Sequence, residues 1–142
     1  MTTRKDFWTD SDIGLLIIRI VMGGTIFFHG WHKVLHGIED QKGLLESIGI
    51  PGFFMYFGYV SEVLAPILII LGILTRLSAI SIIITLIVAI AAIPIDVMAL
   101  GTHGEWVIEV QLFFLLVPVG LFFTGPGRFV LMKNKSGSWL LD

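Results

Sequence analysis

Three ionisable side chains, Arg19, Glu62 and Glu109, lie within stretches of sequence that are otherwise apolar. On insertion scales, a charged side chain at the centre of a membrane helix costs about 2.5–3.5 kcal/mol. Such side chains usually pair with one another or line a site, so they are candidates for chemistry. Glu62 can carry a proton, and Arg19 can hold an anionic or carbonyl group. The alternative is a purely structural salt bridge between Arg19 and Glu62.

A second candidate pair joins His29 to Glu109. Both are expected roughly 8–9 Å from the membrane midplane, counting about 1.5 Å per helical residue. A carboxylate and an imidazole that share a hydrogen bond can relay protons, although the same pair can also serve only to hold two helices together. We therefore take His29, Glu62 and Glu109 as candidate catalytic residues of a proton relay and leave the structural alternative open.

The histidines raise the question of a haem or metal site; they are His29, His32, His36 and His103. His32 and His36 are four residues apart and would share one face of a helix. No acidic residue on that helix completes a ligand set, because Glu39 and Asp40 are expected in the following loop. The sequence therefore predicts no metal ligands and does not favour haem.

The composition indicates a membrane protein. Of 142 residues, 56% are hydrophobic and 14% are charged, whereas soluble domains carry about 25% charged residues. There is no cysteine, which excludes disulfides, thiolate nucleophiles and CxxC redox pairs. A net charge of −2 without a basic stripe argues against a nucleic-acid partner.

Four apolar segments are each close to the roughly 20 residues needed to span a bilayer. In lipid the backbone must satisfy its own hydrogen bonds, so these segments are expected to be helices. The first is longer than the apolar region of a signal peptide, about 7–15 residues, so we expect it to be retained. The prediction is an all-α, integral membrane four-helix bundle in a single domain, 1–142, with helices at about 13–34, 54–74, 77–95 and 106–124 and a tail at 125–142.

The distribution of Lys and Arg predicts the orientation. One side of the membrane has Lys33 and Lys42, and the other collects Arg4, Lys5, Arg76, Arg128, Lys133 and Lys135. Both termini are therefore expected in the cytoplasm, with the connections 35–53 and 96–105 outside. On this placement, the polar residues converge on the outer half of the bundle.

Two helices carry small and polar residues on one face. On the first helix the face consists of Arg19, Gly23, Ile26, Gly30, Lys33 and Gly37, and on the second of Gly58, Glu62, Ala65, Ile69, Gly72 and Arg76. Glycines on such a face allow helices to approach closely in lipid, so the two faces are expected to pack together. Pro66, one turn after Glu62, is expected to free a carbonyl beside the polar cluster.

Several motifs share their order and spacing with a known family. They are Arg19-x3-Gly23-x5-His29-Gly30-x2-Lys33, Gly49-Ile50-Pro51, Glu62 with Leu71-Gly72-x2-Thr75-Arg76, Gly104-Glu105-Trp106-x2-Glu109-x-Gln111, and Gly125-Pro126-Gly127-Arg128. In this combination the chain resembles the DoxX family of small bacterial membrane proteins. The family usually continues with a Ser-Leu-Asp-like ending, for which this chain has Phe129-Val130-Leu131-Met132.

The resemblance implies a multi-pass protein of the bacterial inner membrane with an oxidoreductase-associated role. It suggests a subunit of a quinone-linked oxidoreductase that binds a quinone or similar apolar carrier in the outer half of the bundle. Glu62, Glu109 and His29 would then handle protons, and the residues expected to bind the carrier are Arg19, Lys33 and Gln111. Electrons would come from a soluble or membrane redox partner or a bound cofactor, because the sequence shows no redox centre of its own.

Two other classes of function stay open at this stage. One is a small proton-coupled transporter or lipid-binding protein that uses the same residues. The other is a non-catalytic membrane scaffold for soluble redox partners.

Overall fold

The computed structural model describes residues 10–92, 96–132 and 139–141. Three helices are long and apolar enough to cross a membrane: α1 (Ser11–His36), the helix Gly52–Leu71, and α5 (Thr75–Ala92). The second of these is built from η2 (Gly52–Phe54), α3 (Met55–Tyr59), η3 (Val60–Leu64) and α4 (Ala65–Leu71). The remaining helices are α2 (Glu39–Ser47), the apolar α6 (Glu109–Thr124) and the short η4 (Trp139–Leu141).

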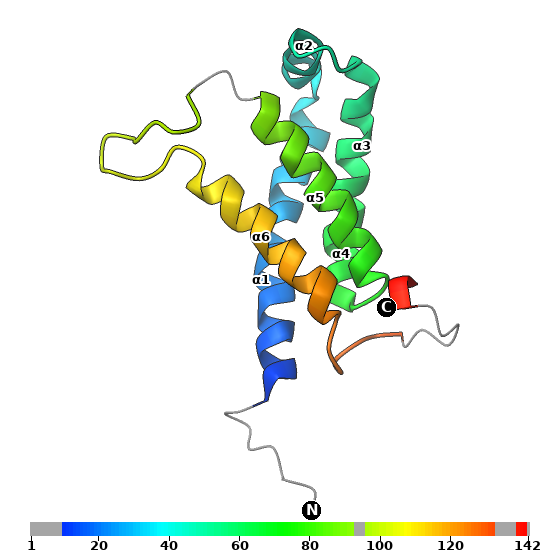
Figure 1. The fold of residues 1–142 in the computed structure, drawn as a ribbon. Helices are drawn as coiled ribbons and strands as arrows, with labels where there is room; N and C mark the ends of the chain where they lie inside the picture. Colours follow the sequence, from blue (N-terminus) through cyan, green and yellow to red (C-terminus); the bar gives the residue numbers. More distant parts are fainter. Residues whose placement is uncertain (1–9, 93–95, 133–138, 142) are drawn as a thin grey trace, which may run out of the picture.

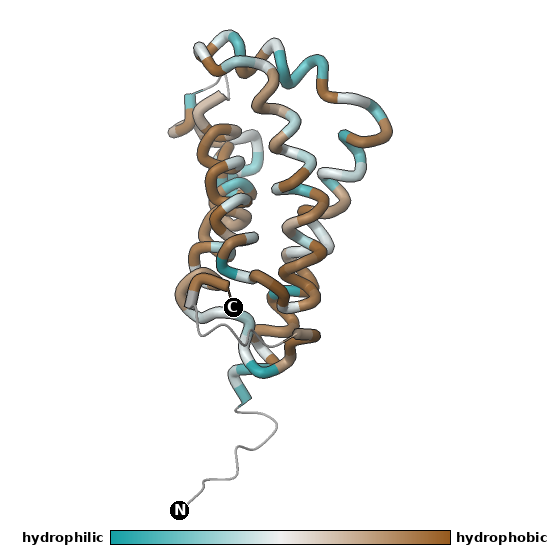
Figure 2. The backbone as a smooth tube through the Cα atoms, turned by 90° about the vertical axis from the view of Figure 1, so that its right-hand side faces the viewer, coloured by the Kyte–Doolittle hydropathy of each residue, from teal (hydrophilic) through white to brown (hydrophobic). Residues whose placement is uncertain are grey.

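The helices form an elongated bundle (Figure 1). The chain rises through α1, turns at α2, returns through α3 and α4, rises again through α5 and descends through α6 (Figure 1). As a result, the start of α1 and the end of α6 lie at the end of the molecule opposite α2, here called the α2-distal end. Most residues along the helices are hydrophobic, and the hydrophilic residues lie mainly toward the two ends of the bundle (Figure 2). The expected all-α membrane class is thereby confirmed.

Capping residues define where the long helices begin and end. The side chain of Asp10 accepts a hydrogen bond from the backbone N–H of Asp12 at 3.0 Å, which caps the start of α1. Beyond α4, Gly72 adopts a left-handed conformation with φ of 71°, and the N–H of Ile73 donates to the Leu68 carbonyl. This is a common C-terminal stop, and it ends the second apolar helix at Leu71 rather than at 74 as expected.

The two glycine-bearing faces predicted from the sequence do pack together. A Cβ added to Gly30 would lie 2.3 Å from the carbonyl oxygen of Glu62, so α1 approaches the backbone of η3 directly. At Gly23, an added Cβ would lie 3.0 Å from the Pro66 carbonyl oxygen. Gly37 does not pack in this way; it ends α1 with φ of 84°.

A continuous apolar core lies between the helices. It consists of Met22, Ile26, Ala65, Ile69, Ile82 and Leu121. Many large apolar side chains on the outside stay exposed, among them Phe28 and Phe113. Extensive exposed apolar surface is what a protein in contact with lipid presents.

The start of α6 differs from the sequence prediction. This helix begins at Glu109 rather than at about 106, because the preceding segment folds back on itself. There Leu100 pairs with Trp106 in an isolated antiparallel bridge, and the N–H of Val107 donates to the Ala99 carbonyl at 3.1 Å. With 16 residues, α6 is shorter than the other apolar helices.

The connection between the first two apolar helices contains the nine-residue helix α2. The expected end of the third helix at 95 lies outside the described residues, as do Arg4, Lys5, Lys133 and Lys135.

Candidate functional site

Glu62 forms its ion pair with Lys33. The Nζ atom of Lys33 donates to Oε1 of Glu62 at 2.6 Å, joining α1 to η3. The two side chains are only 22% and 13% exposed, respectively. A charge pair so largely withdrawn from solvent is costly to break, because removing one partner leaves the other charge unpaired.

Glu62 sits in a π-helical turn, η3, which interrupts the second apolar helix. Within this turn the N–H of Ala65 donates to the carbonyl of Val60, five residues earlier. Pro66 follows, and it has no N–H to donate to the Glu62 carbonyl as an α-helix would require. The expected irregularity beside the polar cluster thus takes the form of a π-turn followed by a proline, and π-turns are frequent at functional sites.

A cavity of about 240 Å³, here called the polar cavity, lies beside the ion pair. Its apolar walls come from Ile26, Ile82, Leu86, Val110 and Phe114, and its polar residues are His29, Lys33, Glu62, Thr85 and Gln111. Two buried atoms of these residues, Oε2 of Glu62 and Oε1 of Gln111, have no hydrogen-bond partner. Buried polar atoms are nearly always hydrogen-bonded, so a donor bound in this cavity is the expected partner for both.

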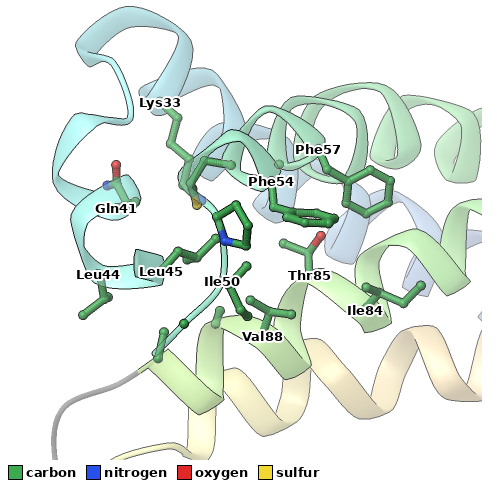
Figure 3. Close-up of a pocket in the computed structure, with 16 residues that line it drawn as sticks. Lys33, Gln41, Leu44, Leu45, Ile50, Phe54, Phe57, Ile84, Thr85 and Val88 are labelled. Carbon is green, nitrogen blue, oxygen red and sulfur yellow. The ribbon is translucent and has the colours of Figure 1, made fainter. Parts of the chain in front are cut away.

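A larger cavity of about 400 Å³, here called the apolar cavity, lies between α2, α3 and α5. Figure 3 shows Leu45, Ile50, Phe54 and Val88 around it, with Lys33 and Thr85 as polar members of its wall. Lys33 and Thr85 also line the polar cavity, so the two cavities are neighbours that share these side chains in their walls.

Thr85 is a site residue that the sequence reasoning missed. Its hydroxyl donates to the hydroxyl of Ser61 at 2.7 Å, which links α5 to the π-turn. Ser61 is fully buried and in turn donates to the Phe57 carbonyl at 3.2 Å. The available signal was the position of Ser61 directly before Glu62, together with a hydroxyl near the middle of the apolar third helix.

Arg19 does not pair with Glu62. Its guanidinium is 1% exposed and donates four hydrogen bonds of 2.7 Å to backbone carbonyls, those of Ile69, Ile70, Pro126 and Phe129. The last carbonyls of a helix have no partner within it, so the end of α4 offers acceptors to an arginine. An added Cβ at Gly72 would lie 2.6 Å from Nη2, so glycine is needed for this contact. Arg19 lines neither described cavity.

The expected hydrogen bond between His29 and Glu109 is also not formed. Glu109 is exposed at the start of α6, where its Oε2 accepts from the backbone N–H of Trp106 at 3.2 Å. The ring of His29 meets Phe114 edge-on, with 5.8 Å between centroids. Gln111, one half-turn after Glu109, is the residue of α6 that brings a polar side chain to the cavity.

The α2-distal end is held by further arginines. Arg76 is buried rather than at the surface, and its Nε donates to the Phe122 carbonyl at 2.9 Å. Arg128 forms ion pairs with Asp10 and Asp12.

His32 and His36 stack with 4.0 Å between ring centroids. Within residues 10–92, 96–132 and 139–141, no group of three or more His, Asp or Glu side chains is arranged to hold a metal ion.

Together, these features describe a small helical membrane protein with a partly buried ion pair beside two neighbouring cavities. The chain belongs to the DoxX family, whose model matches residues 14–95, more than half of the sequence. The matched region contains Lys33, Glu62 and Thr85, whereas Glu109 and Gln111 lie beyond it.

A curated relative is the protein named "Putative oxidoreductase CatD" of Bacillus subtilis (strain 168). It is 32% identical over 62 residues, which cover 44% of this chain and 46% of that protein. The chain thus matches about half the length of this relative. No solved structure matches the chain.

Proposed function

We propose that this DoxX family protein binds a quinone or a similar apolar carrier, with the polar head of the carrier in the polar cavity. The observation that carries the proposal is the Lys33–Glu62 pair, which leaves Oε2 of Glu62 buried without a partner beside Oε1 of Gln111. Lys33 supplies a donor, and the two oxygens supply acceptors. A quinone carbonyl needs a donor and a quinol hydroxyl needs an acceptor, so the cavity suits both forms.

Reduction of a quinone adds two electrons and two protons and makes two O–H bonds. In this proposal the electrons come from the redox group of a partner protein, as the relative's oxidoreductase name suggests. Glu62 and Lys33 hold protons at the head of the carrier, and His29 on the cavity wall assists them. Glu109, exposed at the start of α6, exchanges protons with water. Arg19 acts only in holding the helices together.

For the topology, we propose that α6 completes a four-helix bundle and that both termini are cytoplasmic, in a bacterial inner membrane. The start of α1 and the end of α6 lie together at the α2-distal end (Figure 1), where Arg76 and Arg128 are also found. The positive-inside rule places such an end in the cytoplasm. Four helices contribute to one apolar core: α1, α4, α5 and α6. We therefore propose that residues 1–142 form a single domain.

A second candidate function is lipid binding without redox chemistry. It is favoured by the apolar cavity, whose lining is polar only at Lys33, Gln41 and Thr85. In that case the occupant has no quinone ring, and Glu62 binds a different head group.

Binding of quinone to the purified protein tests the first candidate. The variant Glu62→Gln removes the negative charge, and we expect it to weaken binding of the reduced form, a benzoquinol, by about tenfold or more, since the quinol hydroxyl donates to the carboxylate and a charged hydrogen bond contributes about 1.5–3 kcal/mol. The matched control is Asp40→Asn, an exposed carboxylate on α2 that lines neither cavity. Equal affinities for wild type and Glu62→Gln would overturn the proposal. Mass spectrometry of molecules that co-purify with the protein separates a quinone from a lipid.

A further inference from the structure

The lining of the apolar cavity includes both exposed and buried apolar side chains. Its lining includes Phe54, Phe57 and Ile84, which are 51%, 39% and 49% exposed. On the α2 side its walls are Leu45 and Met55, both buried. An apolar molecule in the bilayer therefore reaches this cavity laterally, between α3 and α5, without passing through water.

A strap of three residues, Gly49-Ile50-Pro51, covers the end of the cavity and connects α2 to η2. Ile50 packs against the buried cluster of Ile38, Leu45 and Met55. In Figure 3, Ile50 and Leu45 lie on one side of the cavity and Phe54 and Phe57 on the other. The space between these walls is mostly apolar.

The two cavities differ in size and in chemistry. Sites for drug-sized ligands usually have about 300–1,000 Å³, and the polar cavity, with about 240 Å³, is smaller than this range. It has room for a compact ring but not for a ring with a long substituent. The apolar cavity adds about 400 Å³ and shares Lys33 and Thr85 with the polar cavity.

We propose that the apolar cavity receives the tail of the same ligand, a single apolar chain, which enters from the membrane between α3 and α5. The head of the ligand then passes Lys33 and Thr85 and stops at Glu62 and Gln111. This inference rests on the proposed function and extends it from a head group to an amphiphile with one apolar chain. Binding of the tail is governed by apolar contact and not by hydrogen bonds, because the residues around it offer few polar groups.

Two quinones that share one ring separate the tail site from the head site. One is a benzoquinone with a methyl group at every ring position, which leaves no position for a thiol to add, and in the other a decyl chain replaces one of these methyl groups. We expect wild-type protein to bind the tailed form about tenfold or more tightly, because each buried methylene adds to the affinity. Filling the apolar cavity with Ala89→Phe should remove this preference and leave the affinity for the tail-free form unchanged.

Ala91→Phe is the matched control for that variant. Ala91 lies on the same helix, is exposed like Ala89, and does not line the cavity. It should keep the full preference for the tailed quinone. If Ala89→Phe keeps it as well, the tail inference is wrong while the proposed function stands. If wild type binds neither quinone, the proposed function fails, and this inference fails with it.

A second measurement tests the tail site with smaller substitutions, in case Ala89→Phe prevents folding. Because the chain has no cysteine, Ala89→Cys and Ala91→Cys each introduce a single thiol. The tailed quinone should slow maleimide labelling of the first thiol and leave the second unaffected, and the tail-free quinone should slow neither. Equal labelling of the Ala89→Cys variant with and without the tailed quinone would overturn the inference.

Discussion

The Nζ atom of Lys33 lies 2.6 Å from Oε1 of Glu62, while Oε2 of the same carboxylate is buried and has no hydrogen-bond partner. One oxygen therefore ties the π-turn to α1, and the other stays available in the polar cavity. This division lets a single residue contribute to both the packing of the bundle and the binding of a ligand.

Loss of Lys33 should expose how much the ion pair contributes to stability. We expect Lys33→Met to lower the free energy of unfolding by about 1–3 kcal/mol, because the Glu62 carboxylate is then left without its partner. In the double variant with Glu62→Gln, most of this loss should be recovered. Thermal unfolding of all four proteins in detergent gives the coupling energy of the pair. Additive effects of the two substitutions would show that the pair makes no net contribution.

Gly30→Ala should destabilise the contact between α1 and η3. The added Cβ would lie 2.3 Å from the Glu62 carbonyl oxygen, a backbone atom that cannot move without shifting the helix. We expect a loss of about 1–3 kcal/mol in the free energy of unfolding. Gly24→Ala is the matched control, because an added Cβ at Gly24 meets nothing within 4 Å. If the two variants unfold alike, the close approach is not important for stability.

Arg19→Leu should be among the most destabilising changes in the chain. It removes four hydrogen bonds to buried or partly buried backbone carbonyls and leaves those carbonyls without the guanidinium donors. An expected loss of at least about 3 kcal/mol follows from the cost of unsatisfied buried groups. At low temperature, the fraction that remains folded should bind benzoquinone with wild-type affinity. Weaker binding by folded Arg19→Leu would instead assign Arg19 to the ligand site.

The stability of α2 and its contact with α3 should depend on pH through Lys42, which donates to Glu39 within α2 and to Tyr56 of α3. The hydrogen bond from Lys42 to Glu39, and a second to Tyr56, raise the pKa of this lysine above its usual 10.5. A raised pKa means that the stabilisation is complete below pH 10.5 and is lost as the pH rises through the higher, folded-state value. Fluorescence of a label on α2 should report release in that alkaline range. Lys42→Met should show no such transition, and Tyr56→Phe separates titration of the lysine from that of the tyrosine.

Much of this fold follows from the sequence alone. The lengths of the apolar segments predict the membrane helices, since only a self-satisfied backbone is stable in lipid. The spacing of Gly23 and Gly30 predicts which face of α1 packs on the second helix, because helical periodicity determines the residues that share a face. The motifs also identify the DoxX family, which the comparison confirms.

The partners of the charged residues were decided only by the tertiary structure. The sequence offered a salt bridge between Arg19 and Glu62 as one alternative, but carbonyls at the end of α4 and at Pro126 and Phe129 accept the hydrogen bonds of Arg19 instead. Glu62 pairs with Lys33 through a π-turn that the apolar pattern does not reveal. The two cavities depend on side chains from several elements at once, so no local pattern specifies them. The sequence determined which residues are polar within the membrane, and the packing of the helices determined what each of them touches.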